Sequence, residues 1–165
     1  MPLTFSALKT ELQTDPRAYG YASLLAASNW NAVRDLLNLP RTGANGGPAI
    51  TIRRDDVSSS EIFERIDMAD MPALSGTPNA NLLSIERQRL AWLTGLAAIP
   101  LIRITNDDGT NTGAATTILA IFPAGSGTRT RLVALGNRFG SRAEELFGRN
   151  LAVSDGDVET AWKLP

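Results

Sequence analysis

Carboxylates are the side chains that could carry chemistry in this sequence, because it contains no histidine and no cysteine. Without those residues the chain lacks the commonest general base, the thiol nucleophile and the thiolate metal ligand. An enzyme would have to use carboxylates, lysine or backbone groups. The acidic pairs to consider are Asp55 with Asp56, Glu61 with Glu64, Asp107 with Asp108, and Glu144 with Glu145.

The glutamate pairs do not predict a catalytic acid and base. Neighbouring side chains on a helix point about 100° apart, so Glu144 and Glu145 cannot face one substrate. Glu61 and Glu64 share a helix face, and we interpret them as a solvated surface with favourable charge near a helix N-terminus. We interpret Asp55-Asp56 as part of a turn. The sequence therefore predicts no catalytic residues and no enzyme.

Two polar loops raise the question of a bound ion. Residues 106–113, NDDGTNTG, carry the oxygen ligands that a hard cation prefers, but lack the spacing of a calcium loop. We interpret them as a turn that ends a strand, and we predict no metal and no cofactor. Residues 123–131, PAGSGTRTR, place small residues before a helix N-terminus that could hold an anion. The lysine of a nucleotide-binding loop is missing, so we interpret this segment as a linker and N-cap.

Arginine and aromatic residues suggest protein contacts. All basic residues except Lys9 and Lys163 are arginines, which fits an oligomer, although genomic base composition would produce the same bias. The tryptophans and the Tyr19/Tyr21 pair are interpreted as core residues or as subunit-contact anchors. The candidate interface residues are Arg17, Tyr19, Tyr21, Arg129, Arg131, Arg142, Glu145 and Trp162.

The spacing of apolar residues predicts a mainly helical fold. Phe5, Leu8 and Leu12 recur at helical spacing, and Asp15-Pro16 ends this first helix. Two short helices follow, the second capped near Ser28 and ended by Pro40. Residues 82–99 form the strongest helical pattern, which we expect at the centre of the fold.

Two short strands are predicted at Ile50–Arg53 and Leu101–Thr105, and we expect them to pair with each other. The overall prediction is one compact domain spanning residues 1–165. It has seven or eight short helices and a small two-stranded β element, with flexible loops near 41–48 and 68–81. The N-terminus does not resemble a signal peptide, and no apolar run approaches the roughly 20 residues that span a bilayer. We therefore expect synthesis in the cytoplasm and no membrane contact.

The stretch GSRAEELFG, residues 140–148, is interpreted as a joint between two helices. Gly140 and Gly148 fit helix ends, and Ser141 with Glu144 fits a capping box. On this interpretation Arg142 and Glu145 are free to face a neighbouring subunit. Replacing both with alanine would then impair assembly and leave the monomer folded.

Several of these stretches resemble small proteins encoded among the virion structural genes of tailed bacteriophages. The resemblance is carried by ALKTELQTDPRAYGYA, LLNLPR, RRDDVSSSEIFERID, NDDG and GSRAEELFG…VSDGDVETAWKL. It implies a virion protein made in the host bacterial cytoplasm. The role implied first is a neck or head-to-tail connector subunit in a homo-oligomeric ring, contacting portal, connector or tail subunits. A tail, collar or capsid-decoration subunit is the alternative.

A small nucleic-acid-binding or regulatory protein is the second hypothesis. Arg129, Arg131, Arg138 and Arg142 would form its phosphate-facing strip, although their spacing keeps only some of them on one helix face. The net charge of −1 gives no strong nucleic-acid signal. A carboxylate enzyme ranks third and would require acidic groups to converge in one cleft.

Overall fold

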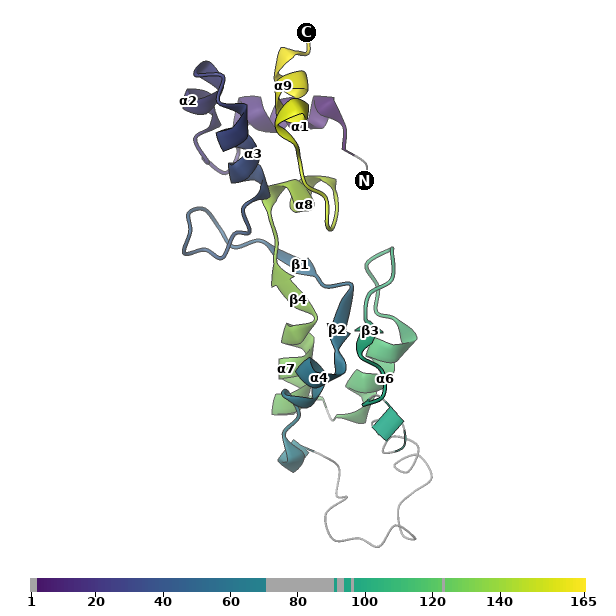
Figure 1. Cartoon of the computed structure of the whole chain (residues 1–165). Coiled ribbons are helices and arrows are strands. Elements are labelled where there is room, and N and C mark those ends of the chain that lie inside the picture. The colour runs from purple at the N-terminus through teal and green to yellow at the C-terminus, as the bar shows by residue number, and fades with distance from the viewer. Residues whose placement is uncertain (1–2, 71–90, 92–93, 96, 123) are drawn as a thin grey trace, which may run out of the picture. The chain divides into compact units, whose positions relative to one another are not determined.

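A computed structural model describes residues 3–70, 91, 94–95, 97–122 and 124–165 (Figure 1). Within these residues the chain forms eight α-helices, one 3-10 helix and two small two-stranded sheets. The predicted fold class, mainly helical with a small β component, is confirmed. The chain divides into two compact units: unit 1 is Met1–Ile52 with Phe139–Pro165, and unit 2 is Arg53–Arg138. The single folding domain stays a prediction, because compact units in one chain can still unfold together.

Unit 1 joins the two ends of the sequence, drawn in purple and yellow in Figure 1. Its helices are α1 (Phe5–Thr14), α2 (Tyr21–Ala26), α3 (Trp30–Asn38), α8 (Arg142–Phe147) and α9 (Asp155–Lys163). Helix α9 packs against α1 and α3, and α3 also contacts α2 and α8. The buried core consists of Leu8, Leu12, Tyr21, Leu25, Val33, Leu37, Ala143, Phe147, Val153, Val158 and Ala161.

The turn after α1 follows directly from the Asp-Pro sequence. Asp15 has a left-handed backbone with φ of 38° and ends the helix, as predicted. Its carboxylate accepts hydrogen bonds from the backbone N–H groups of Tyr19 (2.7 Å), Gly20 (2.7 Å) and Tyr21 (3.3 Å). One aspartate therefore satisfies the backbone donors that would otherwise be unpaired at the entry to α2.

The cap of α3 differs from the prediction by one residue. Asn29, and not Ser28, is the N-cap, and its side chain accepts from the backbone N–H of Ala32 at 3.2 Å. Ser28 instead lies in the turn before the helix, with a left-handed backbone and φ of 52°. Pro40 follows the helix as expected.

The strand pairing predicted from the sequence is wrong. β1 (Thr51–Arg53) pairs with β4 (Asn137–Phe139), and β2 (Asp56–Ser58) pairs antiparallel with β3 (Leu101–Arg103), with Val57 opposite Ile102. The alternation of apolar residues identifies a strand but not its partner. β4 was missed because three residues, NRF, show no alternation of their own. The chain passes from one unit to the other along β1 and again along β4.

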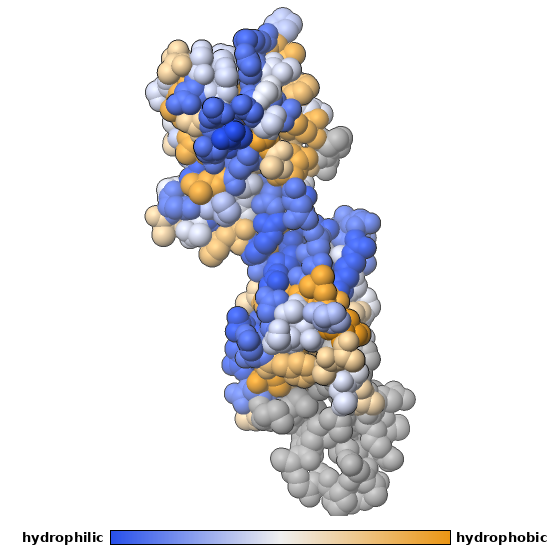
Figure 2. Space-filling model, in the orientation of Figure 1, coloured by the Kyte–Doolittle hydropathy of each residue, from blue (hydrophilic) through white to orange (hydrophobic). Residues whose placement is uncertain are grey.

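In unit 2, α4 packs against β2 and α6 against β3, and α7 packs against both of these helices. Its helices are α4 (Ser59–Phe63), the 3-10 helix η1 (Met68–Asp70), α6 (Gly113–Ile121) and α7 (Gly127–Leu135). Its core consists of Val57, Ile62, Ile102, Ile104, Ala115, Ile118, Ile121, Phe122, Leu132 and Leu135. Large apolar side chains also remain exposed in this unit, namely Phe63, Ile99, Leu101 and Val133. Figure 2 shows hydrophobic surface (orange) beside hydrophilic surface (blue) in unit 2.

The helix predicted at residues 82–99 lies mostly outside the described residues. The same holds for most of the predicted loop at 68–81, of which η1 is the described part.

Candidate functional site

The first cluster of functional candidates is a row of four charged side chains in unit 1, which we call the charged row: Arg17, Glu145, Arg142 and Glu11. The Nε and Nη2 atoms of Arg142 donate to the two carboxylate oxygens of Glu11 at 2.8 and 2.6 Å. Its Nη1 donates to Glu145 at 2.6 Å, and Glu145 also forms an ion pair with Arg17. The row connects α1, the turn after it, and α8.

The centre of the charged row is buried. The side chains of Arg142 and Glu11 are 10% and 3% exposed, whereas Arg17 and Glu145 lie at the edge of the row with about 30% exposure. The hydrogen bonds with Glu11 raise the pKa of Arg142, which keeps it charged. A bidentate pair of this kind fixes both position and orientation of the two helices. Its groups are fully engaged with each other, so the arrangement is a structural joint.

Arg142 was therefore misassigned from the sequence. A position directly after an N-cap suggested a free surface arginine, but residues far apart in the chain bury it. Tyr21 is likewise fully buried, and burial raises the pKa of its phenol. Neither residue offers a surface to another subunit. The joint at 140–148 itself is confirmed in part: Ser141 and Glu144 form the capping box, and Gly148, with φ of 115°, ends α8.

Gly140 has a different role from the predicted helix end. Helix α7 already ends at Gly136, and Gly140 follows strand β4. A Cβ atom at Gly140 would lie 2.2 Å from Cδ1 of Ile52. Glycine is required there because a neighbouring side chain occupies the space of a Cβ.

Arg41 is a buried residue that the sequence reasoning missed. It is 2% exposed, and its guanidinium lies 4.1 Å from the centre of the Tyr19 ring. It donates to the carbonyl of Leu36 at 2.9 Å and to those of Asn45 and Gly46 at 3.2 Å. The loop at 41–48 is thus tied back onto α3 and Tyr19. In the sequence, the only indication of this cation–π contact is that an arginine begins the glycine-rich run.

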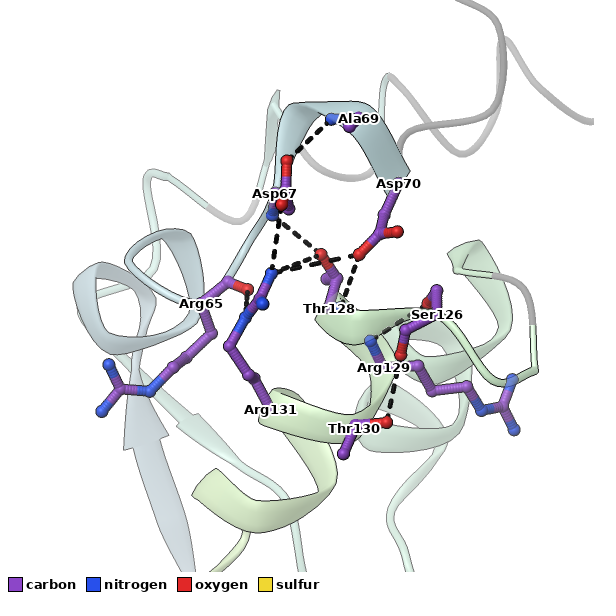
Figure 3. Close-up of polar contacts among 9 residues, drawn as sticks. All are labelled: Arg65, Asp67, Ala69, Asp70, Ser126, Thr128, Arg129, Thr130 and Arg131. Atoms are coloured by element: carbon purple, nitrogen blue, oxygen red, sulfur yellow. Dashed lines mark hydrogen bonds and ion pairs between the residues drawn. The ribbon is translucent and has the colours of Figure 1, made fainter.

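The second cluster lies in unit 2, where η1 meets the N-terminus of α7 (Figure 3). Ser126 is the N-cap of α7 and accepts from the backbone N–H of Arg129, which confirms the predicted cap. The carboxylate of Asp70 accepts from the backbone N–H of Thr128 at 2.6 Å. These hydrogen bonds hold the pKa of Asp70 below its usual value. The helix N-terminus that could have held an anion is therefore occupied by the protein's own carboxylate.

The two arginines of α7 also bind the protein itself. Arg131 donates to the carbonyl of Arg65 at 2.9 Å, and its Nη2 lies 3.8 Å from Asp67 and 3.9 Å from Asp70. Arg129 donates to the carbonyls of Leu119 (2.8 Å) and Phe122 (3.2 Å), at the end of α6. Both arginines thus satisfy carbonyls or carboxylates of unit 2.

The acidic pairs considered from the sequence form no common acidic cluster among the described residues. Glu61 forms a capping box with Ser58 and accepts two hydrogen bonds from Arg54, at 2.7 and 3.1 Å. These hydrogen bonds lower the pKa of Glu61 to about 2. Asp107 pairs with Arg103, and Asp108 accepts from Thr110. In the part of the chain that the structure describes, no group of three acidic side chains could hold a metal ion.

Trp162 and the remaining aromatic candidates lie against the core of unit 1. Trp162 and Tyr19 are half-buried and pack on its buried cluster. The rings of Tyr19 and Tyr21 meet edge to face, with centroids 5.9 Å apart. Their interpretation as core anchors agrees with these positions.

Unit 2 also has an open pocket that the sequence did not reveal, which we call the unit 2 pocket. Its volume is about 110 Å³. Residues of β1, β2, α4, α6, α7 and β4, together with residues just outside these elements, line it: Arg53, Val57, Ile62, Ile104, Asn111, Ala115, Ile118, Leu119, Leu132, Val133, Leu135, Gly136 and Asn137.

Comparison with protein-family models, with curated proteins and with solved structures finds no match. Among the residues that the structure describes, none of the helices has the length and apolar character needed to cross a membrane.

Proposed function

We propose that this chain is a non-enzymatic structural subunit of a tailed-bacteriophage virion. In this role it is a neck or head-to-tail connector subunit that assembles with further copies on a portal or tail ring. The protein's contribution is a scaffold of short helices held together by arginine contacts. Homo-oligomeric rings of this kind are built from repeated contacts between neighbouring subunits.

One observation carries the proposal: the two most specific stretches of the phage resemblance meet in the structure. Asp-Pro…Tyr-Gly-Tyr-Ala and Ser-Arg-Ala-Glu-Glu-Leu lie about 120 residues apart in the sequence. The ion pairs of Arg17 with Glu145 and of Glu145 with Arg142 join them in unit 1. A set of residues that forms one physical joint is more informative than two separate short motifs. If unit 1 is related to the phage proteins, this joint is the feature that they should share with it.

The alternative roles of tail, collar or capsid-decoration subunit share this support. The nucleic-acid hypothesis stays a hypothesis, with a weakened contact surface: Arg142 is buried, and Arg129 and Arg131 bind groups of unit 2, although Arg131 remains 44% exposed. Phosphate binding needs arginines that can face solvent. We therefore rank the structural role first.

Peptide mass spectrometry of purified virions tests the proposal. We expect peptides of this chain in particles banded by density, at a constant ratio to the portal protein across preparations. Particles treated with protease before lysis provide the control for adhering host proteins. Abundance in infected cells combined with absence from purified virions would rule the proposal out. Cryo-EM of the same particles then distinguishes the neck from the tail, collar and capsid surface.

A further inference from the structure

The unit 2 pocket is an opening in the hydrophobic core and not a polar cleft. Its floor is formed by buried apolar side chains from four elements, including Val57 of β2, Ile62 of α4, Ile118 of α6 and Leu132 of α7. Interiors of proteins are normally packed without spaces of this size. An apolar space that opens to solvent suits an apolar group supplied from outside.

The rim of the pocket carries one charge, which is positive. Arg53 is exposed at the rim and donates one hydrogen bond to Asn111. Asn137 donates to the carbonyl of Val133 at 3.0 Å, and Val133 is 51% exposed. None of the described residues that line the pocket is acidic. A guanidinium has five N–H donors, so Arg53 retains donors for an external carboxylate.

We propose that the unit 2 pocket binds one leucine-sized apolar side chain of a partner protein, with a carboxylate beside that side chain held by Arg53. The inference rests on the proposed function, because it assigns a docking surface to an assembly subunit. The charge at the rim selects an acidic-apolar segment over a basic one. The size of the bound side chain follows from the pocket volume of about 110 Å³. For comparison, an apolar cavity of roughly 150 Å³ holds one benzene molecule.

A small-molecule probe tests the pocket on the isolated full-length chain. The probe is 4-methylpentanoate, which combines the branched end of leucine with a carboxylate, and its uncharged partner is 4-methylpentanamide. We expect methyl NMR signals of Ile104, Ile118 and Leu132 to shift with a dissociation constant on the order of 1 mM. Signals of Val33 and Leu37 in unit 1 should stay unchanged.

Variants that fill the pocket provide the decisive comparison. Ala115→Leu adds three carbons at a lining position of α6 and should abolish the shifts. Ala120→Leu, an exposed position on the same helix, is the matched control and should bind like the parent chain. If Ala115→Leu does not fold, Gly136→Ala is the second variant that reaches into the pocket. Alanine fits the backbone at residue 136, where φ is −67°, and its Cβ would lie 3.7 Å from Cδ1 of Ile104. It should weaken binding to a smaller extent.

The charge at the rim is tested separately. Arg53→Gln should weaken binding of 4-methylpentanoate by about tenfold and leave 4-methylpentanamide unchanged. Arg103→Gln, which removes an arginine outside the pocket lining, is the control. Equal binding of both probes to the parent chain would contradict the contact between the carboxylate and Arg53. Unaltered binding of the probe to the filled variants would contradict binding in the unit 2 pocket. Detection of the chain in virions is independent of both results, so failure of this inference is distinguishable from failure of the proposed function.

Discussion

Unit 1 and unit 2 both use arginine to join segments that are distant in sequence, but in different surroundings. In unit 1, Arg142 meets Glu11 as a bidentate pair that is almost completely buried. In unit 2, Arg131 is 44% exposed and lies 3.8–3.9 Å from two carboxylates. Removing one partner of a buried pair leaves the other charge without compensation, whereas water replaces an exposed partner. The same residue type therefore contributes very differently to the two units.

Arg142→Ala should have the largest effect. We expect it to lower the free energy of unfolding by about 3–5 kcal/mol, because Glu11 remains buried and unpaired. Arg131→Ala should cause a much smaller loss. Urea denaturation followed by circular dichroism measures both. Equal losses in the two variants would contradict the difference between the units.

The double variant Arg142→Met with Glu11→Met sharpens this comparison. It should be more stable than Arg142→Ala, since neither charge is left buried alone.

If the predicted single domain is correct, probes in both units should report one unfolding midpoint. Separate midpoints for unit 1 and unit 2 would contradict the single domain.

Gly140→Ala should have the next largest effect, a loss of about 1–3 kcal/mol from the collision with Ile52. Adding Ile52→Ala should recover part of the stability by removing the colliding side chain. Gly136→Ala in unit 2 is the matched control, because the nearest heavy atom to its Cβ would lie 3.4 Å away. Thermal unfolding of the three variants measures the difference, and similar losses at the two glycines would argue against a steric role for Gly140.

Ser141→Ala should lower the free energy of unfolding by about 1 kcal/mol through loss of an N-cap. Ser141 belongs to a capping box with Glu144, whereas Ser126 of α7 provides only the N-cap hydrogen bond. Ser126→Ala should therefore have the smaller effect of the two. Chemical denaturation decides the order, and the reverse order would show that the capping box adds nothing.

Acidification should change the free energy of unfolding least, and it should do so through Glu61 of unit 2. The pKa of Glu61 is lowered from 4.5 to about 2, so its contribution is present above pH 4.5 and disappears as the pH falls toward 2. Glu61→Gln should therefore lose less stability than the parent chain between about pH 5 and about pH 3. Glu64→Gln, an exposed change outside the capping box, should follow the parent. Urea midpoints at the two pH values measure the effect, and identical pH profiles for all three chains would refute it.

Local patterns predicted much of the helical part of the fold. The apolar spacing of Leu8 and Leu12, the stop at Asp15 and the serine caps at 126 and 141 were all read from neighbouring residues. The strand partners were not predictable in the same way, because three-residue strands carry no pairing information. The site residues were the least predictable. Arg17 and Glu145 looked like independent surface charges, although each is the other's partner.

The sequence by itself determined the helical class, several helix ends, and the lack of histidine and cysteine chemistry. These properties depend on residue type and on spacing within a few positions. Only the tertiary structure decided that Arg142 is buried, that Arg41 lies over Tyr19, and that unit 2 has a pocket rimmed by Arg53. Burial and charge pairing arise where distant segments meet, and those contacts set the energy of each arginine.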